Sequence, residues 1–127
     1  AAALARYAGD LRAPVLDLGC GAGLSGAALR DAGFTAVDGA DFAPRMLQAA
    51  KARGVYRELM LTDLSDPLPA APGQYANMAA IGVFSPGHAP ASLIAQVLAA
   101  LPRGGCFAFT LNEHAMKDAE VWVMRRS

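Results

Sequence analysis

The sequence predicts an α/β protein built on a doubly wound, mostly parallel sheet, and three observations carry that prediction. Apolar segments with the period of a strand alternate with segments that have the period of a helix. Glycine and proline stand at the joints between them. The 127 residues are 54% apolar and only 17% charged, which is enough to bury one core and excludes global disorder. We therefore expect a single domain over residues 1–127, with its core at 14–111.

The first half of the chain predicts a helix and then three strands that are separated by two further helices. In chain order we expect a helix at 1–12, a strand at 15–18, a helix at 24–32, a strand at 34–41, a helix at 44–53 and a strand at 55–62. Gly33 and Gly54 suit the ends of the second and third helices, because glycine adopts a left-handed conformation without strain. Pro44 suits the first turn of the third helix.

The second half continues the same alternation. A proline-rich loop at 66–73 leads into a strand at 75–84, whose nearly continuous apolar sequence is typical of a strand buried on both faces. An amphipathic helix then follows Pro90 and ends near Leu101. We expect further strands at 106–111 and at 121–124. Strands that alternate with helices of this length predict a parallel sheet.

Charge and cysteine content exclude several function classes. The 11 Lys and Arg residues balance 11 Asp and Glu residues, so the formal charge is zero and no nucleic-acid or membrane partner is expected. No apolar run approaches the roughly 20 residues of a membrane-spanning helix. The two cysteines, Cys20 and Cys106, form no disulfide framework and favour a cytoplasmic location. Histidine and cysteine show no metal-ligand spacing, so no metal is expected.

The glycine-rich stretch at 19–23 is the strongest functional signal. It stands between a strand and a helix, where missing side chains let a ligand approach exposed backbone N–H groups. Residues 21–26, GAGLSG, match the GxGxxG fingerprint of dinucleotide-binding proteins. In that frame the strand would have to continue through Gly19, with Asp17 in its middle. An NAD-binding protein is therefore the less favoured alternative.

Read from the strand, residues 15–23 spell VLDLGCGAG, and this segment resembles the first motif of the class I S-adenosylmethionine-dependent methyltransferases. The resemblance implies a Rossmann-like sheet with strand order 3-2-1-4-5, an antiparallel last strand as an option, and S-adenosyl-L-methionine as cofactor. A carboxylate at Asp17 suits the methionine amino group of that cofactor. Few residues flank the core, so we expect a fold truncated relative to the complete methyltransferase.

Further matches to the family extend the expected cofactor site. Asp41 ends the second predicted strand about 20 residues after the glycine loop, where an acidic side chain of the family accepts both ribose hydroxyls. By resemblance, Phe42 packs beside the adenine, Met46 lies on the following helix, and Asp63 with Leu64 binds the adenine edge. The cofactor-binding residues that the resemblance implies are Asp17, Gly19, Cys20, Gly21, Gly23, Asp41, Phe42, Met46, Asp63, Leu64 and Gly82.

Two smaller features accompany these matches. The family usually has serine where Ala43 stands, so the helix that follows lacks a side-chain cap, at a cost of about 1 kcal/mol. Residues 101–105, LPRGG, resemble a structural element of the family that marks the fold. Residues 54–59 and 82–90 are similar to the Williams-Beuren chromosome-region methyltransferase-like group.

The segment after the fourth predicted strand should carry the acceptor chemistry. In an open α/β sheet the ligand crevice lies at the carboxyl ends of the strands where the strand order reverses, so residues 82–88 would face the sulfonium methyl. They differ from the Asn-Pro-Pro-aromatic form that grips an amino group of a base or of glutamine. His88 is a candidate general base or a helix cap, and the same alternatives hold for His114. We expect methyl transfer to a small-molecule acceptor, with a cofactor-binding module lacking its own catalysis as the alternative.

Overall fold

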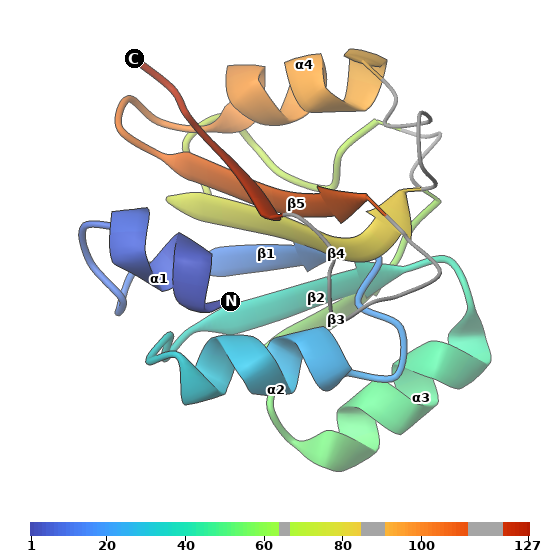
Figure 1. Ribbon diagram of the computed structural model, residues 1–127. Coiled ribbons are helices and arrows are strands. Elements are labelled where there is room, and N and C mark those ends of the chain that lie inside the picture. Colours follow the sequence, from blue (N-terminus) through green and yellow to red (C-terminus); the bar gives the residue numbers. More distant parts are fainter. Residues whose placement is uncertain (64–66, 85–90, 112–120) are drawn as a thin grey trace.

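The computed structural model describes residues 1–63, 67–84, 91–111 and 121–127, and its centre is one six-stranded sheet. The elements are α1 (Ala2–Tyr7), β1 (Val15–Leu18), α2 (Leu24–Asp31), β2 (Val37–Asp41), α3 (Pro44–Arg53), β3 (Glu58–Leu61), β4 (Asn77–Phe84), α4 (Ala91–Ala100), β5 (Cys106–Leu111) and β6 (Val121–Arg125). The strand order is β3-β2-β1-β4-β5-β6 (Figure 1). Strands β1 to β5 run parallel, and β6 is antiparallel to β5, which confirms the predicted order and the antiparallel last strand.

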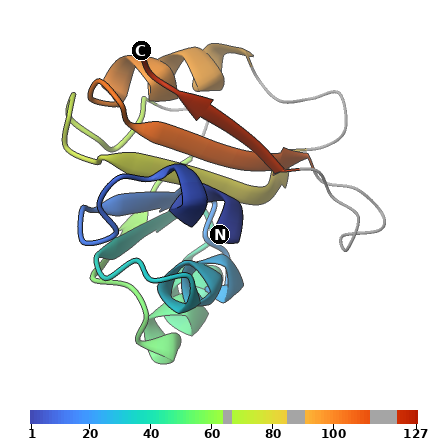
Figure 2. The same cartoon turned by 60° about the vertical axis from the view of Figure 1, so that its left-hand side comes forward.

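Helices cover both faces of this sheet, because successive side chains of a strand point to opposite faces. On β1, Val15 packs in one core cluster and Leu16 in another. The first cluster includes Leu4 of α1 and Leu29 of α2, and the second includes Val97 of α4. Figure 2 shows α1 and α2 together on one side of the sheet and α4 on the other. The layered arrangement leaves the carboxyl ends of β1, β2 and β4 side by side at one edge.

Several elements are shorter than the sequence predicted. Helix α1 ends at Tyr7 because Ala8 is extended, with ψ 138°. Strand β2 begins at Val37, although Phe34 before it is only 1% exposed. Tyr75, also 1% exposed, lies before β4 in the same way. These aromatic residues pack into the core from loops, so the apolar pattern extends beyond the hydrogen-bonded strand.

The predicted glycine and proline positions are confirmed. Gly33 and Gly54 have φ of 114° and 70°, and Pro44 stands in the first turn of α3. A Cβ on Gly105 would lie 2.7 Å from the carbonyl oxygen of Ala76, so this glycine of the 101–105 element serves the fold. In the described ranges, no helix combines the length and apolar character needed to cross a membrane.

A buried polar cluster lies near the amino ends of β2, β3 and β4, on the opposite face of the sheet from Asp17. Asp38 of β2, 1% exposed, accepts hydrogen bonds from the Arg57 guanidinium at 3.0 and 2.9 Å and from the Tyr75 hydroxyl at 2.7 Å. The Glu58 N–H donates a further bond at 3.2 Å. Burial works to raise the pKa of Asp38, but the bonds from Arg57 and Tyr75 outweigh it and hold that pKa below its usual value.

Candidate functional site

The glycine loop between β1 and α2 has a backbone that only glycine adopts readily. Gly19, Gly21 and Gly23 have φ of 65°, 54° and 100°, all in the left-handed region. A Cβ on Gly23 would also lie 2.8 Å from the side chain of Arg53, whose Nε donates to the carbonyl oxygen of Ala22 at 2.9 Å. The loop therefore folds tightly against the end of α3, and its shape depends on glycine at alternate positions.

Asp41 ties this loop to the end of β2. Its Oδ1 accepts the N–H of Gly21 at 3.3 Å, and its Oδ2 accepts the N–H of Ala43 at 3.0 Å. Ala43 makes no side-chain cap at the start of α3, as the sequence predicted. The Asp41 carboxylate accepts the N–H of Ala43 itself, just before the helix, so a single acidic group bonds both turns at this edge of the sheet.

A cavity of about 390 Å³ opens beside the glycine loop. Its lining comprises Gly19, Cys20, Gly21, Ala22, Leu24, Ser25, Ala28 and Ile81. Ile81 belongs to β4, and the others belong to the loop after β1 and to α2. The cavity thus lies between the carboxyl ends of β1 and β4, where the strand order reverses, which is the place predicted for a ligand.

Asp17 is buried between β1 and the first turn of α2, with no exposed surface. Its Oδ2 accepts hydrogen bonds from the Ser25 and Tyr56 hydroxyls, each at 2.7 Å. Its Oδ1 has no partner among the described residues. Burial raises the pKa of Asp17 to about 6, and the bonds from Ser25 and Tyr56 counter only part of that rise. In this conformation the carboxylate has no surface of its own exposed to the cavity.

Tyr56 is the residue of this site that the sequence did not reveal. It comes from the α3–β3 connection and reaches Asp17 across 39 positions of sequence. The signal that could have found it is Gly26, an otherwise unfavourable glycine inside a helix. A Cβ on Gly26 would lie 2.3 Å from the Tyr56 ring, so the glycine is there to admit the tyrosine.

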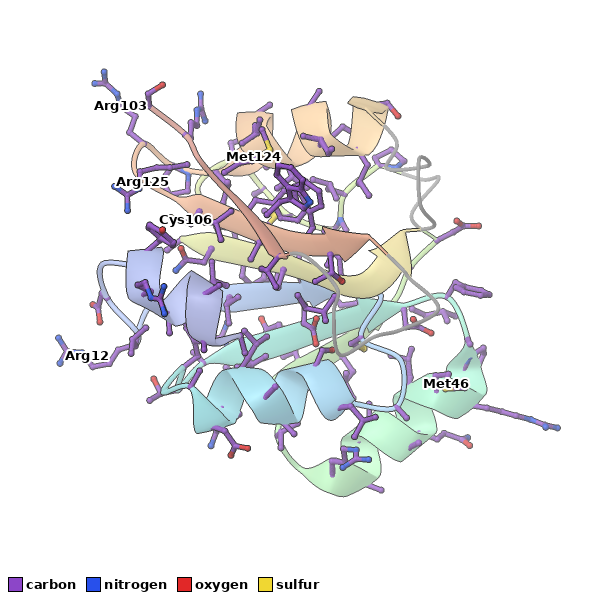
Figure 3. All side chains as sticks on the ribbon, viewed as in Figure 1. Arg12, Met46, Arg103, Cys106, Met124 and Arg125 are labelled. Atoms are coloured by element: carbon purple, nitrogen blue, oxygen red, sulfur yellow. The ribbon has the colours of Figure 1, made fainter. Side chains whose placement is uncertain are left out.

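The other predicted residues form three groups: a buried cysteine, two exposed side chains near the start of α3, and residues from the later part of the chain. Cys20 is 3% exposed, and burial together with the charges of Asp17 and Asp41 raises the pKa of its thiol to about 12, so it is not a nucleophile at neutral pH. Phe42 and Met46 are exposed, at 71% and 46%, around the start of α3, and Figure 3 labels Met46 there.

The third group concerns the later part of the chain. Asp63 is exposed and follows β3, and Gly82 lies within β4. Leu64, His88 and His114 fall outside the described residues. The structure therefore brings together the loop glycines, Cys20, Asp17 and Asp41, with Phe42 and Met46 after the end of β2.

The residues present suit the cofactor that the sequence resemblance implies. The unpartnered oxygen of Asp17 puts an incompletely balanced negative charge next to the cavity, as a ligand with a cationic group requires. Asp41 supplies acceptor oxygens at the end of the neighbouring strand. The loop glycines leave the cavity wall open to close approach.

Comparison with known proteins agrees with this geometry. Residues 15–105 match the model of a methyltransferase domain family. Human methyltransferase-like protein 27 is 38% identical over 91 residues, which cover 71% of this chain and 37% of that protein. Mouse 18S rRNA (guanine-N(7))-methyltransferase is 41% identical over 61 residues, or 48% of this chain and 21% of that protein. The chain spans well under half the length of these relatives.

Solved structures show the same fold. The complex between the Haloferax volcanii Trm112 methyltransferase activator and a protein described as a methyltransferase matches with a TM-score of 0.71 and 29% identity, over 86% of this chain and 49% of that one. An S-adenosylmethionine-dependent methyltransferase from Mesorhizobium loti matches with a TM-score of 0.70 and 24% identity, over 99% of this chain and 65% of that one.

These findings correct one expectation from the sequence. The exclusion of a nucleic-acid partner is wrong, because rRNA methyltransferases are among the relatives and a structural neighbour occurs in a complex with a protein activator. A net charge of zero is a sum over the whole chain, and it says nothing about a local binding surface.

The likeness to the Williams-Beuren chromosome-region group stays a prediction. The methyltransferase domain family supports S-adenosyl-L-methionine as the cofactor. The family model covers most of the chain, and the matched residues include the glycine loop and the acidic end of β2. The chain therefore belongs to the methyltransferase domain family.

Proposed function

We propose that residues 1–127, with a core at 14–111, form the cofactor-binding domain of a methyltransferase and hold S-adenosylmethionine across the carboxyl ends of β1, β2 and β4. The observation that carries the proposal is the bond between the Asp41 carboxylate and Gly21, a residue of the cavity wall. It puts an acceptor pair for a ribose next to a cavity large enough for part of a nucleoside. Small-molecule sites of this kind combine a mostly apolar wall with a few convergent polar groups.

The predicted residues from Asp41 onward take the following roles in this proposal. Asp41 accepts the ribose hydroxyls, and the exposed side chains of Phe42 and Met46 offer apolar surface to the adenine. Asp63 and Leu64 bind the adenine edge. Gly82 of β4 is the residue expected near the transferred methyl group.

The chemistry needs little from the protein beyond binding and orientation. When bound, S-adenosylmethionine supplies a methyl group activated by its positive sulfur, and the acceptor's nucleophilic atom displaces S-adenosylhomocysteine. The glycine loop and Asp41 orient the donor, and such positioning accounts for several kcal/mol of a displacement barrier. Asp17, when ionised, contributes a negative charge that favours a cationic ligand in the cavity.

The cofactor assignment is tested by calorimetry with S-adenosylmethionine and S-adenosylhomocysteine. We expect Asp41→Ala to weaken binding at least tenfold, or about 1.4 kcal/mol, because it leaves two ribose hydroxyls without acceptors. Asp10→Ala is the matched control, since Asp10 is an exposed aspartate whose side chain bonds Arg12 away from the cavity. A wild-type protein that binds neither ligand at millimolar concentration overturns the cofactor assignment. An Asp41→Ala protein with wild-type affinity means that another group holds the ribose.

The methyl acceptor is tested separately. The 18S rRNA methyltransferases among the relatives make RNA the first acceptor class to assay, and small molecules form the competing panel. Transfer of a labelled methyl group to rRNA, in the presence and absence of a Trm112-type activator, is the measurement, because a structural neighbour occurs with that activator. Cofactor binding without transfer to either class supports the alternative of a binding module without its own catalysis.

A further inference from the structure

Three glycines from three different elements surround the ring of Tyr56. A Cβ on Gly26 of α2 would lie 2.3 Å from its Cζ, and a Cβ on Gly39 of β2 would lie 2.9 Å from its Cε1. A Cβ on Gly23 in the loop would lie 3.3 Å from its Cε2. Two of these distances are shorter than real contacts allow. The sequence thus provides a slot for this one ring.

The Tyr56 hydroxyl makes two bonds at the end of that slot. It accepts the N–H of Gly26 at 3.1 Å and donates to Asp17 Oδ2 at 2.7 Å. Helix α2 begins after Gly23, a residue with no side chain to cap it. The N–H groups of a first helical turn have no partner within the helix, so Tyr56 acts as a cap from the α3–β3 connection. One hydroxyl therefore links the start of α2 to the buried carboxylate of β1.

We propose that Tyr56 is a positioning residue of the cofactor site, which keeps Asp17 ionised and α2 in place so that the cavity binds a cationic donor. The proposal rests on the proposed function for its ligand, and on the slot and the two hydrogen bonds for its geometry. A phenylalanine would fill the slot equally well. The proposed role therefore depends on the hydroxyl group of Tyr56 and its two hydrogen bonds, and not on the packing of the ring.

The charge of Asp17 is the property through which Tyr56 acts. The groups around this carboxylate are the Ser25 and Tyr56 hydroxyls, the Cys20 thiol, the Asp41 carboxylate and the amino group of Ala1. Burial raises the pKa of Asp17 to about 6, and the hydrogen bond from Tyr56 works against that rise. Loss of the hydroxyl raises the pKa further, because the ionised form loses a donor. The neutral form then persists to higher pH.

The sign of the pH effect follows directly. A cationic ligand favours ionised Asp17, so the affinity for S-adenosylmethionine falls as pH falls through the pKa of this group. In the ligand-free protein the opposite holds for stability. A pKa above the unfolded value means that the folded state takes up the proton first, so stability decreases as pH rises from about 4 to about 6.

The experiment measures both profiles for the wild type and for Tyr56→Phe between pH 4 and pH 8. We expect the midpoint of the pH dependence of S-adenosylmethionine affinity to move up by about one unit in Tyr56→Phe. The pH range over which the melting temperature of the ligand-free protein decreases should move up by the same amount. Ser25→Ala removes the other donor to Asp17 Oδ2 and should shift both profiles in the same direction.

Tyr75→Phe is the matched control. It removes a hydroxyl that also lies 2.7 Å from a buried carboxylate, but Asp38 projects to the opposite face of the sheet from Asp17. Its pH midpoints between 5 and 8 should equal those of the wild type. A Tyr56→Phe protein with wild-type midpoints overturns the proposal, and so does a loss of affinity that is uniform with pH. A wild type that binds no cofactor overturns the proposed function instead, while the melting profile still tests the link between Tyr56 and Asp17.

Discussion

Two buried aspartates on neighbouring strands, β1 and β2, project to opposite faces of the sheet and differ in how their charge is balanced. Asp38 and Asp17 each accept a tyrosine hydroxyl at 2.7 Å. Asp38 also has a guanidinium on both oxygens and a backbone N–H, and its pKa is lowered. Asp17 has only hydroxyl donors, leaves one oxygen without a partner among the described residues, and has a raised pKa. The same residue type thus serves the fold in one place and costs stability in the other.

The difference indicates which of the two groups is available to a ligand. A buried charge that is fully paired adds little when a further cation arrives, because its field is already balanced. A buried carboxylate whose hydrogen bonds come only from hydroxyls has part of its desolvation cost still uncompensated, and a bound cation can relieve it. Asp38 and its partners therefore hold β2, β3 and the start of β4 together. Asp17, with Ser25 and Tyr56, belongs to the candidate cofactor site.

The largest effect should come from breaking the satisfied cluster. Asp38→Ala leaves the Tyr75 hydroxyl and the Glu58 N–H without their acceptor, and should lower the free energy of unfolding by about 3–4 kcal/mol in urea titrations at pH 7. The wild-type contribution of Asp38 should be lost as pH falls below about 4, because its folded pKa lies under the unfolded one. Asp31→Ala, a change at an exposed position, is the control. A loss below 1 kcal/mol would contradict the structural role.

The next effect has the opposite sign. Asp17→Asn removes a buried charge with a raised pKa, so the ligand-free protein should gain about 2–3 kcal/mol at pH 7 while its affinity for S-adenosylmethionine falls. Thermal unfolding from pH 4 to pH 7 checks the first part, because the variant should lack the decrease that the wild type shows as pH rises to about 6. Calorimetry checks the second. A variant that is less stable than the wild type at pH 7 would refute the comparison between the two aspartates.

The smallest effect concerns the slot of Tyr56. Gly26→Ala forces a Cβ into the tyrosine ring, and the overpacking, partly offset by a better helix propensity, should cost about 1–2 kcal/mol. Gly9→Ala introduces the same atom where nothing lies within 4 Å, and should leave stability unchanged. Denaturant titration of the two variants measures the difference. Equal stabilities would show that the ring can move aside at no cost.

Much of this fold follows from the sequence because its signals are local. Strands β1 and β5 have the predicted bounds, 15–18 and 106–111, since each is an apolar run with proline or glycine immediately before it. Helix α3 lies between Pro44 and Gly54 as predicted. The methyltransferase assignment likewise depends on a contiguous motif and its spacing. The loop after β1 and Asp41 therefore came together as expected.

The remainder depends on contacts that no local pattern encodes. Tyr56 bonds residues 30 and 39 positions away, and its neighbours in sequence give no hint of its direction. The full burial of Asp17 is a property of the packed α2 and of that tyrosine. The exclusion of a nucleic-acid partner failed for a different reason, because overall charge does not report where charges lie.

Gly26 and Tyr56 also bear on how this chain can vary in evolution. The small residue and the large ring occupy one volume, so neither position can change freely while the other stays fixed. Descendants that acquire a side chain at 26 are expected to have lost the aromatic ring at 56. In a motif search Gly26 is the last glycine of a dinucleotide-binding fingerprint. Covariation between positions 26 and 56 would instead identify it as the packing partner of Tyr56.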